Sequence, residues 1–132
     1  MPMTYWVKYS VGFVLENKLL NKEYYFKEGC YIQEWQNSAD QPGMSIARVR
    51  VLRKTATRLH ALRNTTERYV ILSGEAEVTV DAKSWTVGVG DVVNIAPNQA
   101  QKIENRTNQD LVFLAVCTPR FVIENYYDLE SQ

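Results

Sequence analysis

Short segments in which polar and apolar residues alternate, separated by turn residues, run through the chain from about residue 28 onward. Ser45–Leu52 carries two arginines on one face and apolar side chains on the other, and Glu75–Asp81 alternates in the same way. A period of two residues is typical of strands that pack one face on a core. Because no helical period separates these segments, they predict an all-β fold, an antiparallel sandwich or barrel. The remaining predicted strands are Tyr31–Trp35, Glu67–Leu72, Trp85–Val87, Val92–Ile95, Gln101–Asn105 and Leu111–Cys117.

Length and charge limit the class of protein. The 132 residues suffice for one domain with a core. Fifteen basic and fifteen acidic side chains give a formal net charge of zero, which argues against nucleic-acid or membrane-surface partners and permits self-association. No apolar run reaches the roughly eighteen residues of a membrane span, and no signal pattern opens the chain. With Cys30 and Cys117 as its two cysteines, we expect a cytoplasmic protein with reduced thiols.

Three segments are predicted along the chain. Residues 1–28 are rich in aromatic residues, so we expect them to pack on the barrel or on a partner subunit rather than stay exposed. Residues 29–118 are predicted to form the barrel. Residues 119–132 contain several aromatic side chains and are predicted to cover an open edge or the mouth of that barrel.

The chain contains one histidine, His60, which is part of the first of two motifs. They resemble the two motifs of the cupin family, G-x5-H-x-H-x3–4-E-x6-G and G-D-x4–5-P-x-G-x2-H-x3-N. The matching positions are His60, Glu67, Gly74, Gly90, Asp91, Pro97 and Asn105. Three positions differ: Leu62 and Gln101 replace the second and third histidines, and Asn98 stands where the family has glycine.

The resemblance covers about residues 29–118 and implies an antiparallel double-stranded β-helix, or jelly roll. In cupins, the histidines and the glutamate point into the barrel and hold a metal. The resemblance therefore implies that His60, Glu67 and Gln101 point inward and bind a divalent transition metal such as Mn, Fe, Ni or Zn. The chain also resembles a group of small single-domain prokaryotic cupins that have Gln at the position of the third histidine.

Each of these residues has a structural interpretation beside the functional one. His60 is either a ligand or a hydrogen-bonded structural residue. Glu67 needs a partner inside a barrel, which is either a metal or a cation such as His60 or an arginine. Gln101 either offers its amide oxygen to a metal or lines the barrel and bonds to Glu67. Leu62 is an apolar filler that weakens the metal prediction.

Three further residues are candidates for substrate binding. Arg48 and Arg50 share one strand face, where guanidinium groups either stay solvated or grip a carboxylate or phosphate. Tyr69 follows Glu67 by two residues and is either a hydrogen-bond donor in the pocket or part of the core.

The resemblance implies a small metal-binding cupin that acts on a small polar metabolite. Our first expectation is a sugar-phosphate isomerase similar to the cupin-type mannose-6-phosphate isomerases, in which Glu67 or His60 moves a proton. The alternative is a non-catalytic barrel that binds a small ligand with a degenerate metal site. Cupin barrels commonly pair their sheets, so the resemblance also implies a homodimer.

Overall fold

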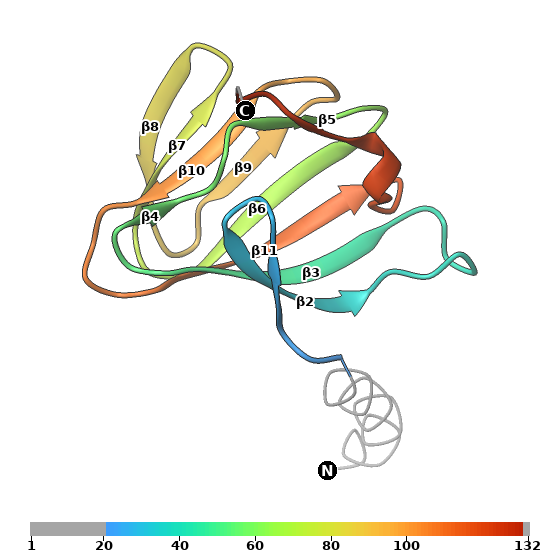
Figure 1. The fold of residues 1–132 in the computed structure, drawn as a ribbon, viewed down its shortest axis with the longest axis horizontal. Coiled ribbons are helices and arrows are strands. Elements are labelled where there is room, and N and C mark those ends of the chain that lie inside the picture. Colours follow the sequence, from blue (N-terminus) through green and yellow to red (C-terminus); the bar gives the residue numbers. More distant parts are fainter. Residues whose placement is uncertain (1–20, 131–132) are drawn as a thin grey trace.

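The computed structural model describes residues 21–130, so most of the predicted N-terminal segment, residues 1–20, lies outside the described part. The described chain forms two facing antiparallel sheets (Figure 1), which confirms the all-β prediction. The large sheet contains, in spatial order, β1 (Tyr24–Phe26), β2 (Cys30–Gln36), β3 (Ser45–Val51), β11 (Leu111–Thr118), β6 (Thr66–Ser73) and β9 (Val92–Ile95). The small sheet contains β12 (Tyr126–Asp128), β5 (His60–Leu62), β10 (Gln101–Asn105), β7 (Ala76–Val80) and β8 (Lys83–Val87), and β4 (Thr55–Ala56) also pairs with β10.

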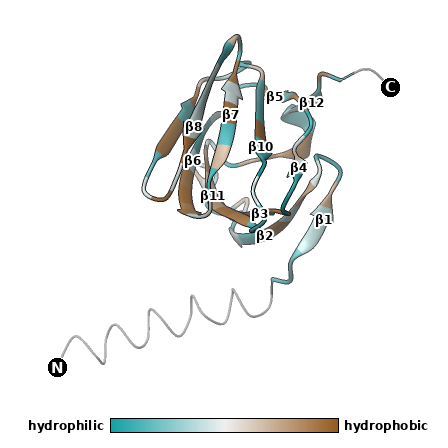
Figure 2. Ribbon diagram, turned by 90° about the vertical axis from the view of Figure 1, so that its left-hand side faces the viewer, coloured by the Kyte–Doolittle hydropathy of each residue, from teal (hydrophilic) through white to brown (hydrophobic). Residues whose placement is uncertain are grey.

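The alternation of residue types directs one face of each strand to the interior. In β11, Leu111, Phe113, Ala115 and Cys117 are buried and the residues between them are half-buried. This strand pairs with β3 on one side and β6 on the other, so its buried face lies at the centre of the large sheet. Hydrophobic and hydrophilic residues follow one another along the strands in Figure 2, as expected when one face meets a core.

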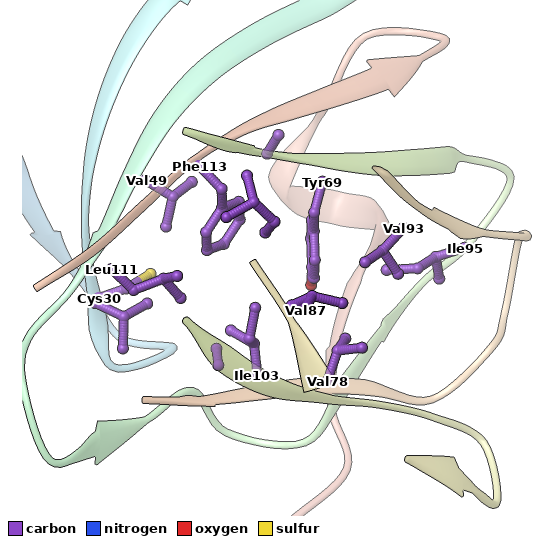
Figure 3. Close-up of a cluster of buried hydrophobic side chains, with 14 of the residues drawn as sticks. Cys30, Val49, Tyr69, Val78, Val87, Val93, Ile95, Ile103, Leu111 and Phe113 are labelled. Atoms are coloured by element: carbon purple, nitrogen blue, oxygen red, sulfur yellow. The ribbon is translucent and has the colours of Figure 1, made fainter. Parts of the chain in front are cut away.

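The core lies between the two sheets (Figure 3). The large sheet contributes side chains such as Val49, Phe113 and Ile95, and the small sheet contributes Val78 and Ile103. Tyr69 crosses this interior from β6, and its hydroxyl points toward the small sheet (Figure 3). Its ring packs on Phe113 with the centroids 4.6 Å apart.

The turn residues of the two motifs serve the fold. Asn98, which replaces the family's glycine, has φ +70°, a left-handed conformation that Asn tolerates better than most residues. Gly74 has φ +92°, and a Cβ there would come within 2.9 Å of the Asp110 carbonyl oxygen. Asn105 is fully buried, and its Nδ2 donates to the carbonyl oxygens of Val51 and Gln109. These residues fix turns and a loop that join neighbouring strands of the barrel.

Both ends of the described chain add edge strands. β1 pairs with β2 at one edge of the large sheet, and β12 pairs with β5 at one edge of the small sheet. A 3-10 turn, Ile123–Asn125, leads into β12. Cys30 and Cys117 are both buried and free, as predicted. Within residues 21–130, no helix has the length and hydropathy needed to cross a membrane.

Candidate functional site

A cavity of about 60 Å³ lies between the sheets, which is room for more than one water molecule. Its walls come from β1, β2, β3, β6 and β11 of the large sheet and from β5 of the small sheet. Most of the lining is apolar, and Leu62 is part of it. No lysine or arginine of the described chain lines the cavity. The polar lining residues are Glu28, Glu34, Asn37, Ser45, His60, Glu67, Tyr69 and Cys117.

His60 is held in one orientation on β5. Its Nδ1–H donates to the Arg58 carbonyl oxygen at 2.7 Å, and its ring stacks on Tyr126. The side chain is 2% exposed, and this burial lowers its pKa, while the Arg58 carbonyl raises it in part. The neutral ring with the proton on Nδ1 therefore leaves Nε2 as an acceptor.

Glu28 provides the partner for that acceptor. It lies in the turn between β1 and β2, and its Oε1 is 3.2 Å from His60 Nε2. The pKa of Glu28 is raised to about 8, mainly by burial and also by the charge of Glu67, while the Cys30 thiol lowers it in part. Burial favours the uncharged form of both groups, and at this distance a protonated Glu28 can donate to the neutral His60 ring. Sequence reasoning missed Glu28, because it precedes both motifs and only the following Gly29 marks a turn there.

Glu67 reaches the same cavity from β6 of the facing sheet. Burial raises its pKa to about 7, whereas the neighbouring Gln101 amide and Cys117 thiol lower it. Its Oε1 is buried and has no hydrogen-bond partner among the described residues. An unpartnered acceptor inside a barrel is costly, so it marks a place where a ligand or water is expected to bind.

Gln101 lies on β10, directly opposite His60 in the β5–β10 pairing. It is fully buried, and its Oε1 accepts a hydrogen bond from the Tyr69 hydroxyl. Its Nε2 lies near Glu67 but makes no hydrogen bond of normal geometry within the described structure. The structure thus brings His60, Glu67 and Gln101 together from three strands, and Tyr69 orients Gln101.

This arrangement does not fit a divalent metal ion. Gln101 turns its nitrogen, which is no ligand, toward Glu67, and its oxygen is used by Tyr69. Within residues 21–130, no group of three or more His, Cys, Asp and Glu side chains is arranged to hold a metal.

Arg48 and Arg50 lie away from the cavity. Both form ion pairs with Glu23, and Arg50 also pairs with Asp110. They occupy the face of β3 opposite to the buried Val49. The structure therefore does not bring them together with His60 and Glu67, and their predicted substrate role gains no support from their position.

Sequence comparisons identify relatives of the chain. A sequence model of the cupin domain matches residues 49–117. The uncharacterized protein MJ1618 of Methanocaldococcus jannaschii is 32% identical over 111 residues, which are 83% of this chain and 89% of that protein.

Solved structures share the fold. A study of the Mn(II) centres of Bacillus subtilis oxalate decarboxylase provides one, with a TM-score of 0.72 and 25% identity over 84% of this chain. The chain spans 31% of the length of that enzyme. A structure of Streptomyces PAC13 with uridine also has a TM-score of 0.72, at 13% identity over 86% of this chain and 88% of that protein. PAC13 is described as a nucleoside dehydratase.

Proposed function

Because the chain belongs to the cupin family, we propose that its interior cavity is an active site that moves protons on a small organic molecule. The observation that carries this proposal is the unpartnered Oε1 of Glu67 in a cavity that also contains the Glu28–His60 pair. These groups come from different segments and converge on one small space, as acid–base catalysis requires.

The chemistry follows from the protonation states. Glu67, with a pKa of about 7, accepts and releases a proton at neutral pH. As a carboxylate it removes a proton from a carbon next to a carbonyl or carboxyl group, and the C–H electron pair forms a C=C bond. Glu28, whose Oε1 lies 3.2 Å from His60 Nε2, donates its proton to the oxygen that receives the displaced electron pair. The reverse steps, with the proton returned at a different position or face, complete an isomerisation without any external reagent.

The lining restricts the reacting part of the substrate. Since the cavity presents carboxyls and no described lysine or arginine, it disfavours a buried anion. The predicted sugar-phosphate isomerase activity therefore finds no phosphate partner here. We propose instead that the group entering the cavity is small, uncharged and largely apolar.

A second candidate function is ligand binding without turnover, as in the degenerate-site alternative. Leu62 favours it, because it fills the position of a family histidine with an apolar side chain that lines the cavity. The two candidates differ in whether Glu67 exchanges protons with the bound molecule.

Hydrogen exchange distinguishes them. The full-length protein is incubated in D2O with a panel of small carbonyl compounds, hydroxy acids and amino acids, and mass spectrometry detects deuterium on carbon. We expect incorporation with at least one compound, and a loss of about a hundredfold or more in Glu67→Gln, in line with the usual size of an acid–base contribution. The matched control Glu75→Gln changes an exposed carboxylate and should retain the wild-type rate.

The same preparation tests the metal predicted from the family resemblance. Elemental analysis after purification without chelators should find far less than one Mn, Fe, Ni or Zn per chain, and exchange should survive EDTA. One tightly held ion per chain, lost in Glu67→Gln, would contradict the proposal. Binding of compounds without any exchange would favour the second candidate.

We further propose that the protein is a cytoplasmic homodimer, as the resemblance implies. The outer face of the large sheet supports self-association, because Leu72 and Val92 on neighbouring strands are 42% and 52% exposed. Light scattering during gel filtration of the wild type and of Leu72→Lys tests this: the variant should shift toward monomer, and equal masses for both would contradict a contact at this face.

A further inference from the structure

A second, more open hollow of about 340 Å³ adjoins the cavity. Residues from β1 and β2 and from the segment after β11 form it. Five residues line both spaces and make up the wall between them: Tyr24, Phe26, Glu34, Asn37 and Phe121. A molecule bound in the hollow therefore lies directly next to the cavity.

Among the described residues, Arg120 is the one lysine or arginine that lines either space. Its backbone N–H donates to the Pro42 carbonyl oxygen at 3.0 Å, which fixes the position of the residue. Its Nε is buried without a hydrogen-bond partner, and the guanidinium forms no ion pair within residues 21–130. A buried donor on a cation without an acceptor indicates a place for an anionic oxygen.

Asn37 supplies the complementary group. Its Nδ2 donates to Glu34 Oε1 at 3.0 Å and to the Phe121 carbonyl oxygen at 2.9 Å, so the amide is held in a fixed orientation. Its Oδ1 is buried and accepts no hydrogen bond from the described residues. Arg120 and Asn37, which both line the hollow, thus have one donor without an acceptor and one acceptor without a donor.

We propose that this hollow binds the head group of a small carboxylic acid that has a hydroxyl or ammonium group next to its carboxylate. Arg120 binds the carboxylate, and Asn37 Oδ1 accepts a hydrogen bond from the neighbouring hydroxyl or ammonium. The uncharged remainder of the acid, which carries the carbonyl group of the proposed reaction, extends past the wall toward Glu67. The subsite rests on the proposed function in one respect, because it identifies the molecule on which the cavity acts. The binding of the head group itself does not depend on proton transfer.

The division between the two spaces supports this assignment. The cavity of about 60 Å³ is too small for a complete substrate and has no lysine or arginine of the described chain to pair with a carboxylate. The larger hollow has the cation that the cavity lacks. Glu34 and Glu124 also line the hollow, which favours an ammonium or hydroxyl donor beside the carboxylate over a second anionic group.

Four probes of equal carbon skeleton test the head group: 2-hydroxybutyrate, 2-aminobutyrate, butyrate and the neutral butyramide. Each is titrated into the 15N-labelled full chain, and the Nε–H resonance of Arg120 is followed by NMR. We expect 2-hydroxybutyrate or 2-aminobutyrate to bind at least several-fold more tightly than butyrate, and butyramide to leave this resonance unshifted. The hydroxy and amino acids together distinguish the two possible donors.

Three variants locate the binding. Arg120→Gln should weaken the binding of the preferred acid by about tenfold to a hundredfold, the usual effect of losing a hydrogen bond to a charged group. Arg120→Lys should restore part of it. Arg106→Gln, which removes an arginine that pairs with Glu77 and Glu104 on a different surface, should leave it unchanged. Backbone NMR spectra show whether each variant keeps the fold.

Equal affinity of folded Arg120→Gln and wild type would overturn the subsite, as would the absence of acid binding or binding of butyrate as tight as that of both 2-hydroxybutyrate and 2-aminobutyrate. Glu67→Gln separates the subsite from the proposed function, since it should still bind the acid while losing exchange. If acids bind in an Arg120-dependent manner but no compound exchanges its protons, the subsite stands and the proposed catalysis fails.

Discussion

The interior has two parts that differ in what burial does for the protein. In one part, Val51, Val78, Ile103 and Leu111 are completely buried and surrounded by other apolar side chains. In the other part, burial is imposed on His60, Glu67 and Gln101, with Glu28 beside them. Apolar burial stabilises the fold, whereas burial of ionisable groups costs free energy.

The part with the buried ionisable groups is the one expected to carry function. A barrel of this size has no structural need for two carboxyls and an imidazole in one small space, and apolar residues of similar volume would stabilise it. Polar groups that are buried, incompletely hydrogen-bonded and gathered around a cavity are therefore the strongest sign of a site.

The largest effect is expected in the apolar part. Ile103→Ala should lower the free energy of unfolding by about 2–5 kcal/mol, because it removes buried methylene groups and leaves a cavity. Urea denaturation of both proteins measures the difference. A loss below about 1 kcal/mol would show that this region repacks and that the contrast between the two parts is weaker than the structure indicates.

In the polar part, we expect a substitution to raise the free energy of unfolding at neutral and alkaline pH. The pKa of Glu67 is about 7 in the folded protein, above its ordinary value of 4.5. The protonated form of Glu67 makes its full contribution to the stability of the folded protein below pH 4.5, and this contribution is lost as the pH rises toward 7. Glu67→Gln should therefore match the wild type near pH 4 and become more stable above pH 7, by up to about 3 kcal/mol.

Urea denaturation at a series of pH values measures this difference. Taking the difference between variant and wild type removes the titration of His60, which is present in both. Glu75→Gln, at an exposed position, should follow the wild-type curve. A flat difference curve for Glu67→Gln would mean that burial does not raise the pKa of its carboxyl, and a variant that becomes less stable than the wild type as the pH rises would mean that the carboxylate has a cationic partner.

A smaller effect is expected from the Glu28–His60 pair. Glu28→Ala should cost about 1–3 kcal/mol, because it leaves the buried Nε2 of His60 without a donor. Glu28→Gln keeps a donor and should cost less. The 15N shifts of His60 provide the readout, since the proton should stay on Nδ1 in both variants; a protonated ring in the wild type at pH 7 would contradict the neutral pair.

Most of the fold follows from the sequence, because alternation is a direct consequence of strand geometry. Val92–Ile95 and Gln101–Asn105 were predicted with the bounds that the structure has, and Ser45–Leu52 differs by one residue. Four strands were missed: β1, β4, β5 and β12. Each has two or three residues, which is too short for a period of two to be recognised, and pairing with a neighbouring strand rather than local pattern defines it.

The site was predictable only in part, because local sequence patterns do not show which distant segments come together. The cupin motifs led to His60, Glu67 and Gln101, and all three prove to be buried. Glu28 was not predictable, because its role depends on a turn that brings it to within 3.2 Å of His60, thirty-two positions later in the chain. Asn37 and Arg120 likewise come together only through the folding of distant segments around one hollow.

The smallest effect is expected at the surface pair formed by Arg50. Its guanidinium makes two hydrogen bonds to Glu23, at 3.0 and 2.7 Å, and a third to Asp110 at 3.2 Å. Because solvent screens this pair, Arg50→Gln should lower stability by less than about 1 kcal/mol, and added salt should reduce the loss further. Arg50→Gln should also leave acid binding and proton exchange unchanged, whereas Arg120→Gln weakens acid binding. A loss of acid binding in Arg50→Gln would restore the substrate role predicted from sequence and move the binding surface to the outer face of β3.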